Sequence, residues 1–123
     1  MENVEQPKLD PKHRDAVIAD LTARRDLIAK GWCKGTYAQD ETGVACLVSS
    51  DRAVSFCLLG AAMRVDENSG YPPSIGNDLI RQAAGRYLTI ATINDSFDSA
   101  DEVIDLLDRA ITLAASLVCS TSP

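Results

Sequence analysis

The stretch AVSFCLLGAAM, residues 53–63, contains no charged side chain. A helix that is apolar on every side belongs in the middle of a domain, because no face of it suits water. We therefore predict a helix over 51–65, capped by Ser50 or Asp51, as the centre of the core. Gly60 costs such a helix about 1 kcal/mol relative to alanine, which indicates that another backbone passes close to it.

Apolar residues at helical spacing predict three more helices around this centre, over 10–30, 75–87 and 99–118. An Asp-Pro pair opens the first of them, with Asp10 as its N-cap. We expect Gly31 to end that helix in a left-handed conformation, which glycine adopts at little cost. Ser99 and Glu102 form a capping box at the start of the last helix.

The segment between the first and second helices is irregular. The turn-forming residues DETG, at 40–43, separate two short stretches of β-forming residues. We predict a short β-hairpin there at most, pairing Thr36–Gln39 with Val44–Val48, because two strands alone are marginally stable. The stretch Leu88–Ile93 alternates with threonine and is predicted to be extended.

These signals together predict a mainly α fold, a compact four-helix domain over 10–118. The chain has 123 residues, which suits one domain with a buried core. The polar stretches at 1–9 and 119–123 are expected to be flexible ends.

The charge of the chain narrows the range of partners. Its net charge is −6 and its pI about 4.6, so the overall field repels a nucleic-acid backbone. No apolar run reaches the roughly 18–20 residues of a membrane span, and the opening MENVEQPKLD lacks the apolar core of a signal peptide. We expect a cytoplasmic protein whose partner is a protein or a small polar ligand.

The cysteines do not form a metal-binding pattern. The chain has four of them and no CxxC pair, and His13 is the only histidine, so we expect no metal and no cofactor. Without a secretory signal the thiols are expected to stay reduced. Cys33 and Cys57 are most simply small buried hydrophobic residues, and a reactive thiol at either position is the alternative.

Acidic residues are concentrated near the end of the chain. Six of them precede Arg109: Asp95, Asp98, Asp101, Glu102, Asp105 and Asp108. The early ones suit the positive end of a helix dipole, and the later ones share one face that we expect to be solvated. The alternative function for this face is a docking surface for a basic partner. Calcium binding is disfavoured, because the sequence has no Asp-x-Asp-x-Asp-Gly loop.

Loop residues on a helical scaffold are the candidates for a binding site. We select Trp32, Cys33 and Tyr37 after the first helix, and Asn94 and Asp95 before the last. The structural alternative is a hydrophobic anchor at Trp32 and a turn made by the Asn-Asp pair. A single pocket requires the two loops to meet, for which we expect a crossing helix geometry or a loop reaching back.

Three pieces of the sequence, taken in order, resemble a known family. They are LIAKGWCKGTYAQDETG (27–43), DRAVSFCLLGAAMR (51–64) and INDSFDSADEVIDLLDRAI (93–111). The order of G-W-C, C-x-x-G-A, Asn-Asp and E-V-x-x-x-x-D-x-A-I is similar to that of a family of small bacterial and phage proteins of unknown function. The resemblance covers about 17–115. It differs at Ile93, where we expect an aromatic residue, and it implies no activity.

We therefore hypothesise a non-enzymatic binding or regulatory module, because no acid–base pair, metal cluster or activated nucleophile is evident. The alternatives are a small cysteine-dependent enzyme and a phage-type inhibitor that sequesters a host protein or nucleotide. Bases concentrate around the first helix and acids around the last, so the two join either within one chain or between chains. Exposed ion pairs contribute only about 0–1 kcal/mol each, which favours a monomer or weak homodimer.

Overall fold

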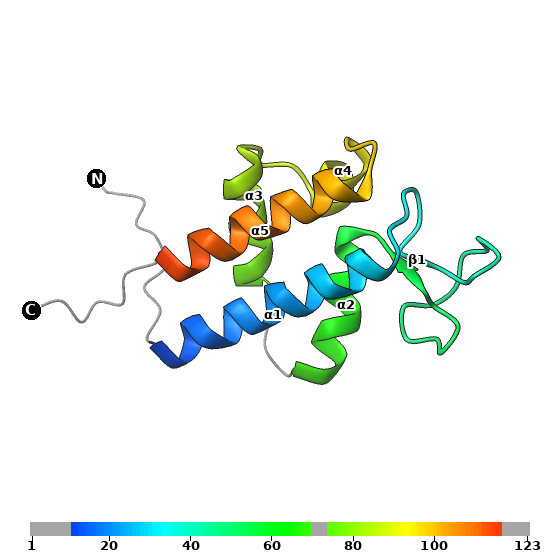
Figure 1. Ribbon diagram of the computed structural model, residues 1–123, viewed down its shortest axis with the longest axis horizontal. Helices are drawn as coiled ribbons and strands as arrows, with labels where there is room; N and C mark the ends of the chain where they lie inside the picture. The colour runs from blue at the N-terminus through cyan, green and yellow to red at the C-terminus, as the bar shows by residue number, and fades with distance from the viewer. Residues whose placement is uncertain (1–10, 70–73, 117–123) are drawn as a thin grey trace, which may run out of the picture.

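The computed structural model describes residues 11–69 and 74–116 and is mainly helical, as predicted (Figure 1). The predicted helix count is wrong, since the described residues form five helices rather than four. They are α1 (Pro11–Lys30), α2 (Leu58–Ser69), α3 (Ser74–Ala84), α4 (Ile90–Asp95) and α5 (Ala100–Ser116), with strands β1 (Ala38–Gln39) and β2 (Ser55–Phe56). The predicted flexible ends, 1–9 and 119–123, lie outside the described residues.

The helices α1 and α5 lie side by side and run in opposite directions (Figure 1). The helix α3 packs against α5, and α2 packs against α1. Their facing apolar side chains form the core, which includes Val17, Leu21, Ile28, Leu58, Leu79, Ile80, Val103, Leu106 and Leu107. A dry core of this kind is the main source of stability in a domain of this size.

A buried guanidinium joins α1 to α3. Arg24 is 0% exposed and donates to both carboxylate oxygens of Asp20, at 3.2 and 2.8 Å. It also donates to the Asn77 side-chain oxygen at 2.7 Å. Gly76 leaves room for it, because a Cβ there would lie 2.8 Å from the Arg24 side chain. Pairing removes most of the cost of burying this charge.

The central helix begins later than predicted. The prediction over 51–65 is wrong at its start, because α2 begins at Leu58 and neither Ser50 nor Asp51 caps it. The preceding residues are extended instead: Phe56 N donates to Gly31 O at 3.0 Å, and Val54 N donates to Gln39 O at 2.9 Å. An uncharged run suits a buried strand as well as a buried helix, so its periodicity does not separate the two.

The pairing of the strands also differs from the prediction. β1 pairs antiparallel with β2, not with Val44–Val48, and the predicted hairpin is reduced to one bridge between Gln39 and Ala45. The predicted turn at 40–43 is present, because the Asp40 side chain accepts from Thr42 N at 2.9 Å and from Val44 N at 3.0 Å. We call residues 32–57, which project beyond the helices, the loop lobe (Figure 1).

Two glycines allow the loop lobe to reach the helices. A Cβ on Gly60 would lie 1.9 Å from Tyr37 O, so the predicted close approach of a backbone at Gly60 is confirmed. A Cβ on Gly31 would lie 2.3 Å from Val54 O. Gly31 does end α1, but it is not among the positive-φ glycines. Its role is close contact rather than the left-handed conformation that we predicted.

The connection from α3 to α5 contains the additional helix. The stretch predicted to be extended, Leu88–Ile93, instead runs into α4, whose N-cap Thr89 accepts from Thr92 N at 3.2 Å. The capping box that begins α5 is confirmed, since Ser99 N donates to Glu102 at 3.1 Å and Glu102 N donates to Ser99 Oγ at 3.4 Å. The threonines of this stretch thus form the cap of a helix, with Thr89 as the N-cap, rather than one face of a strand.

The acids of α5 face solvent, and two of them pair with arginines. Asp105 pairs with Arg109 on the same helix, and Asp108 pairs with Arg25 on α1. The basic first helix and the acidic last helix are therefore joined within one chain. Within residues 11–69 and 74–116, no helix combines the length and apolarity needed to cross a membrane.

Candidate functional site

The side chain of Asn94 joins three segments that are far apart in the sequence. Its oxygen accepts from Trp32 Nε1 at 2.7 Å and from Leu58 N at 3.0 Å. Its amide nitrogen donates to Cys33 O at 3.1 Å and to the Asp95 carboxylate at 3.1 Å. An asparagine side chain offers two acceptor sites and two donors, so its hydrogen-bonding capacity is fully used. Asn94 is 0% exposed and therefore holds the site together rather than contacting a ligand.

The start of α2 is part of the same junction. The Leu58 N–H, which has no partner within its own helix, is the one bound by Asn94. Cys57 precedes the helix, and its sulfur accepts from Gly60 N at 3.2 Å. The cap of α2 is therefore a cysteine supported by a distant asparagine, which no local sequence signal predicts.

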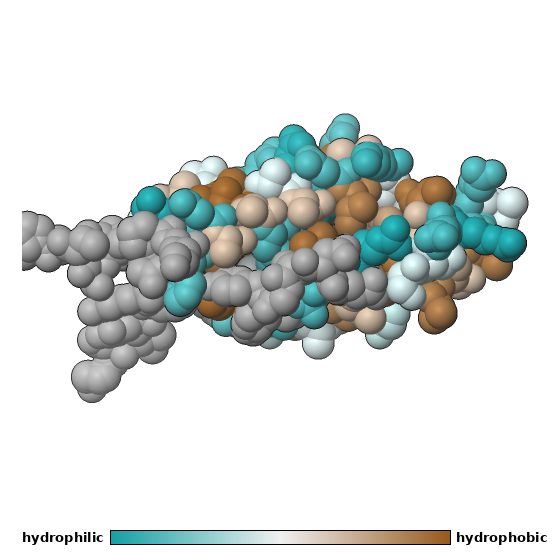
Figure 2. All heavy atoms as spheres, turned by 90° about the horizontal axis from the view of Figure 1, so that it is seen from below, coloured by the Kyte–Doolittle hydropathy of each residue, from teal (hydrophilic) through white to brown (hydrophobic). Residues whose placement is uncertain are grey.

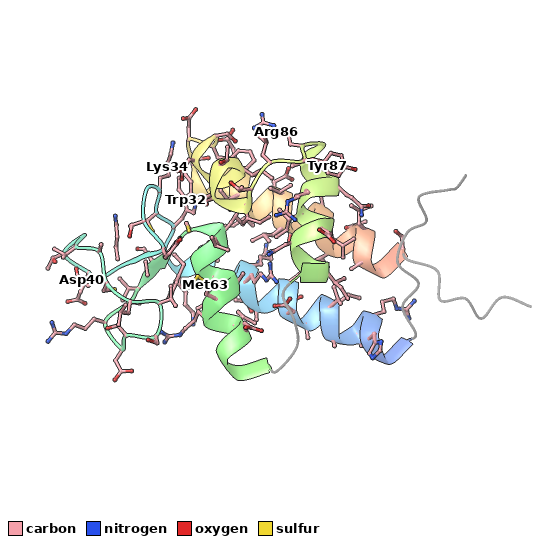
Figure 3. All side chains as sticks on the ribbon, turned by 180° about the vertical axis from the view of Figure 1, so that it is seen from behind. Trp32, Lys34, Asp40, Met63, Arg86 and Tyr87 are labelled. Carbon is pink, nitrogen blue, oxygen red and sulfur yellow. The ribbon has the colours of Figure 1, made fainter. Side chains whose placement is uncertain are left out.

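The rim of the junction is tied to the segment that follows α4. Lys34 Nζ donates to Phe97 O at 2.7 Å and lies 6.0 Å from the centre of the Trp32 ring. Gly35 N donates to Asp95 Oδ1 at 3.4 Å. Figure 3 shows Trp32 and Lys34 close together beside α4, at the base of the loop lobe that carries Asp40. The loop after α1 is thus held against α4 from two sides.

A shallow hollow of about 140 Å³ opens next to this junction. The residues that line it are Gly35, Thr36, Tyr37, Cys57, Ala91 and Asp95. Asp95 is exposed at the surface, whereas Cys57 is buried and only 4% exposed. Tyr37 is half exposed, at 50%. The hollow therefore combines one carboxylate with an aromatic side chain, small apolar groups and backbone.

The five residues selected from the sequence occupy one region but differ in position. Tyr37 and Asp95 line the hollow, whereas Trp32, Cys33 and Asn94 form the hydrogen-bonded support behind it. The expectation that a crossing helix or a loop reaching back is required is wrong. Antiparallel packing places the end of α1 beside the start of α5, and the loops meet there directly (Figure 1).

Sequence reasoning missed Gly35, Thr36 and Ala91 as lining residues, and it considered Cys57 as a packed hydrophobic residue or a reactive thiol rather than as part of a binding hollow. Ala91 lies in a stretch that was predicted to be extended, so its position on a helix was not considered. Gly35 has a φ of 80°, which only glycine adopts readily.

The two thiols of the junction are held in their protonated form. Burial, with smaller contributions from the neighbouring Cys57, Cys46 and Asp95, raises the pKa of the Cys33 thiol to about 11. Burial also raises the pKa of Cys57, although hydrogen bonds from Gly60 and Leu59 act in the opposite direction. A thiol is nucleophilic only as the thiolate, so neither environment activates its sulfur.

This shift predicts that stability depends on pH through Cys33. Below pH 9 the folded and unfolded states both hold the thiol proton, so the group contributes no pH dependence. Between the ordinary pKa of 9.0 and the folded-state pKa of about 11, only the unfolded state loses its proton, so rising pH favours unfolding. We expect a loss of at most about 2–3 kcal/mol across this window, and less where water screens the thiolate.

Urea denaturation at several pH values, for the native chain and for Cys33→Ala, measures this loss. Other groups titrate in the same range, so the comparison isolates the thiol: the native chain should lose more stability than Cys33→Ala between pH 9 and 11. Parallel curves for the two proteins would contradict the shift.

Further hollows among the described residues offer less specific chemistry. One of about 410 Å³ lies on the loop lobe between Asp40–Thr42 and Asp51–Arg52. Another, of about 340 Å³, lies along the acidic face of α5 and includes Asp105 and Arg109, which pair with each other. Among the residues that the structure describes, no group of three or more His, Cys, Asp or Glu side chains is arranged to hold a metal ion.

Comparisons with known proteins bear on the whole chain rather than on the hollow. Neither the curated proteins nor the solved structures contain a match to this sequence. The model of one family, described only as a family of unknown function (DUF6197), matches residues 12–113. This range spans α1 to the last turn of α5 and includes the entire loop lobe. The resemblance noted from the sequence is thereby confirmed, and the chain belongs to the DUF6197 family of unknown function.

Proposed function

We propose that this protein is a non-enzymatic binding module that docks a partner protein through its loop lobe. The observation that carries the proposal is the exposure of large apolar side chains there. Tyr37 is 50% exposed, Val44 60%, Leu47 75% and Val54 41%. Hydrophobic atoms accordingly reach the surface at the lobe end of the molecule (Figure 2). A partner that covers these side chains would remove apolar surface from water, which favours binding.

The loop lobe is held in shape, which favours binding. The Arg64 guanidinium donates to the carbonyls of Val48 and Ser50 and lies 5.7 Å from the centre of the Phe56 ring. Asp40 closes the turn at the tip, where its side chain accepts from Thr42 and Val44. A surface that is already ordered loses less entropy when a partner binds. The fixed carbonyls and turn therefore support a docking role for the exposed side chains.

The raised thiol pKa values argue against the cysteine-dependent alternative. With a pKa of about 11, Cys33 is a thiolate only about once in ten thousand molecules at pH 7. Catalytic cysteines have depressed pKa values and an activating base or cation. The surroundings of Cys33 supply burial and the negative charge of Asp95, which act in the opposite direction.

A peptide-selection experiment tests the docking role. The full chain is used to select binders from a library of displayed random peptides, and synthetic copies of the selected peptides are measured by isothermal titration. We expect Leu47→Asp to weaken their binding at least about tenfold, since it places a charge in an apolar contact. The side chain is 75% exposed, so this change leaves the fold intact.

The matched control is Tyr87→Asp. Tyr87 is 84% exposed in the connection between α3 and α4, away from the loop lobe (Figure 3). We expect this variant to bind the same peptides within about twofold of the native chain. Equal binding by Leu47→Asp and the native chain, or a library that yields no binder, would refute the docking proposal.

A further inference from the structure

We propose that the hollow beside Asp95 receives a lysine side chain of the docked partner protein. This inference rests on the proposed function and adds the chemistry by which the partner is recognised. The hollow is formed partly by the loop lobe, and Tyr37 contributes both to its lining and to the exposed apolar side chains. A partner seated on the lobe therefore brings one of its side chains to the hollow.

The charge of the hollow selects a cation. Asp95 is the only acidic residue among the described residues that line it, and none of them is a lysine or arginine. Lys34, the nearest base along the chain, has its Nζ bound to Phe97 O at 2.7 Å instead. The chain as a whole carries a net charge of −6, so the surrounding field also favours a positive group.

The hydrogen bonds of Asp95 favour an ammonium over a guanidinium. Asn94 and Gly35 both donate to Oδ1, at 3.1 and 3.4 Å. Among the described residues Oδ2 has no such donor. A guanidinium binds best when both carboxylate oxygens are available to its paired N–H groups. A lysine ammonium is a compact charge that needs only one acceptor oxygen, so Oδ2 suits it.

The remaining walls suit the rest of a lysine side chain. Ala91, the buried Cys57, Gly35 and Thr36 surround a space of about 140 Å³. Lysine keeps its aliphatic stem against apolar surface while its charge meets a polar group. Tyr37, half exposed at the edge, adds an aromatic side chain, which attracts cations. The carboxylate needs no rearrangement, because the bonds from Asn94 and Gly35 already fix its position.

Small analogues test the hollow independently of any partner. The probe is Nα-acetyl-lysine methylamide, whose side-chain ammonium is free. It is titrated into the full chain while the backbone amide signals are followed by NMR. N-acetyl-norleucine methylamide, which has the same stem without the charge, is the matched control ligand. We expect saturable shifts at Gly35, Thr36 and Ala91 with the lysine analogue, with millimolar affinity typical of one small group. The arginine analogue should bind more weakly than the lysine analogue.

Two variants connect the shifts to the hollow. Asp95→Asn keeps an oxygen for the bonds from Asn94 and Gly35 and removes only the charge, and we expect it to weaken lysine binding roughly fivefold or more. Ala91→Met fills the space without changing the charge and should remove the shifts. Raising the salt to 1 M should weaken the lysine analogue but not norleucine.

The outcomes separate this inference from the proposed function. Equal shifts with the lysine and norleucine analogues, or lysine binding unchanged in Asp95→Asn, would overturn the lysine site. Lysine binding that depends on Asp95 and persists in Leu47→Asp, which fails to bind the selected peptides, supports both proposals. If the selected peptides bind Leu47→Asp normally while the lysine analogue still requires Asp95, the lobe surface is wrong and the lysine hollow stands.

Discussion

Asn94→Ala is expected to lower the free energy of unfolding by about 3–5 kcal/mol, a large fraction of the stability of a small domain. The Asn94 side chain makes four hydrogen bonds and is 0% exposed. Its loss leaves the Trp32 indole N–H, the Leu58 N–H and the Cys33 carbonyl without partners. Each buried group left unsatisfied costs about 1–3 kcal/mol.

Urea denaturation followed by circular dichroism measures this effect, and hydrogen exchange at the Leu58 amide reports on the junction directly. Trp32 is the only tryptophan, so its fluorescence also follows the local change. The control is Asp95→Asn, which keeps an oxygen acceptor at the neighbouring position and should change stability by less than about 1 kcal/mol. A stable Asn94→Ala protein with a protected Leu58 amide would show that the junction does not depend on Asn94.

Gly60→Ala is expected to destabilise the protein by about 3 kcal/mol or more, although alanine is the better helix former. An added Cβ would lie 1.9 Å from Tyr37 O and 2.8 Å from Tyr37 C. Both are backbone atoms of the segment that leads into β1, which cannot turn aside as a side chain can. Either α2 or the loop lobe must move, and the Cys57 N–H bond to Tyr37 O, 3.2 Å long, would be strained or lost.

Thermal unfolding of Gly60→Ala and of Met63→Ala provides the comparison. Met63 lies on the same helix and is 38% exposed, so its truncation should cost less than about 1 kcal/mol. On helix propensity alone Gly60→Ala would gain about 1 kcal/mol. The two expectations differ in sign, so an increase in stability would rule out the close approach as the reason for this glycine.

The cap of α2 illustrates why local signals failed at the centre of the molecule. Ser50 and Asp51 are good capping residues close to an apolar run. They predict that the helix starts at Asp51, seven residues before α2 begins at Leu58. The intervening residues bond to Gly31 and Gln39 instead. These hydrogen-bond partners are available only once α1 and β1 have formed. The sequence close to residues 51–58 therefore does not show where α2 begins.

For the candidate site, the sequence predicted which residues are involved but not the role of each one. Gly-Trp-Cys and Asn-Asp were recognisable as unusual loop residues, and they do lie together. Their separate roles depended on burial: Asn94 is enclosed by Trp32 and Leu58, while Asp95, its neighbour in the chain, is exposed. A helix turns about 100° per residue, so the direction in which α4 packs determined which of the two side chains faces solvent.

The sequence by itself determined the helical class, the positions of α1 and α5 and the capping box at Ser99, because each depends on interactions within a few residues. It also determined that Gly60 required a close neighbour. Only the tertiary structure decided where α2 begins and that the loops after α1 and α4 meet. The start of α2 and the meeting of the loops depend on hydrogen bonds between residues far apart in the sequence, as from Trp32 to Asn94, 62 positions away. These bonds form only when the antiparallel packing of α1 and α5 brings the two loops together.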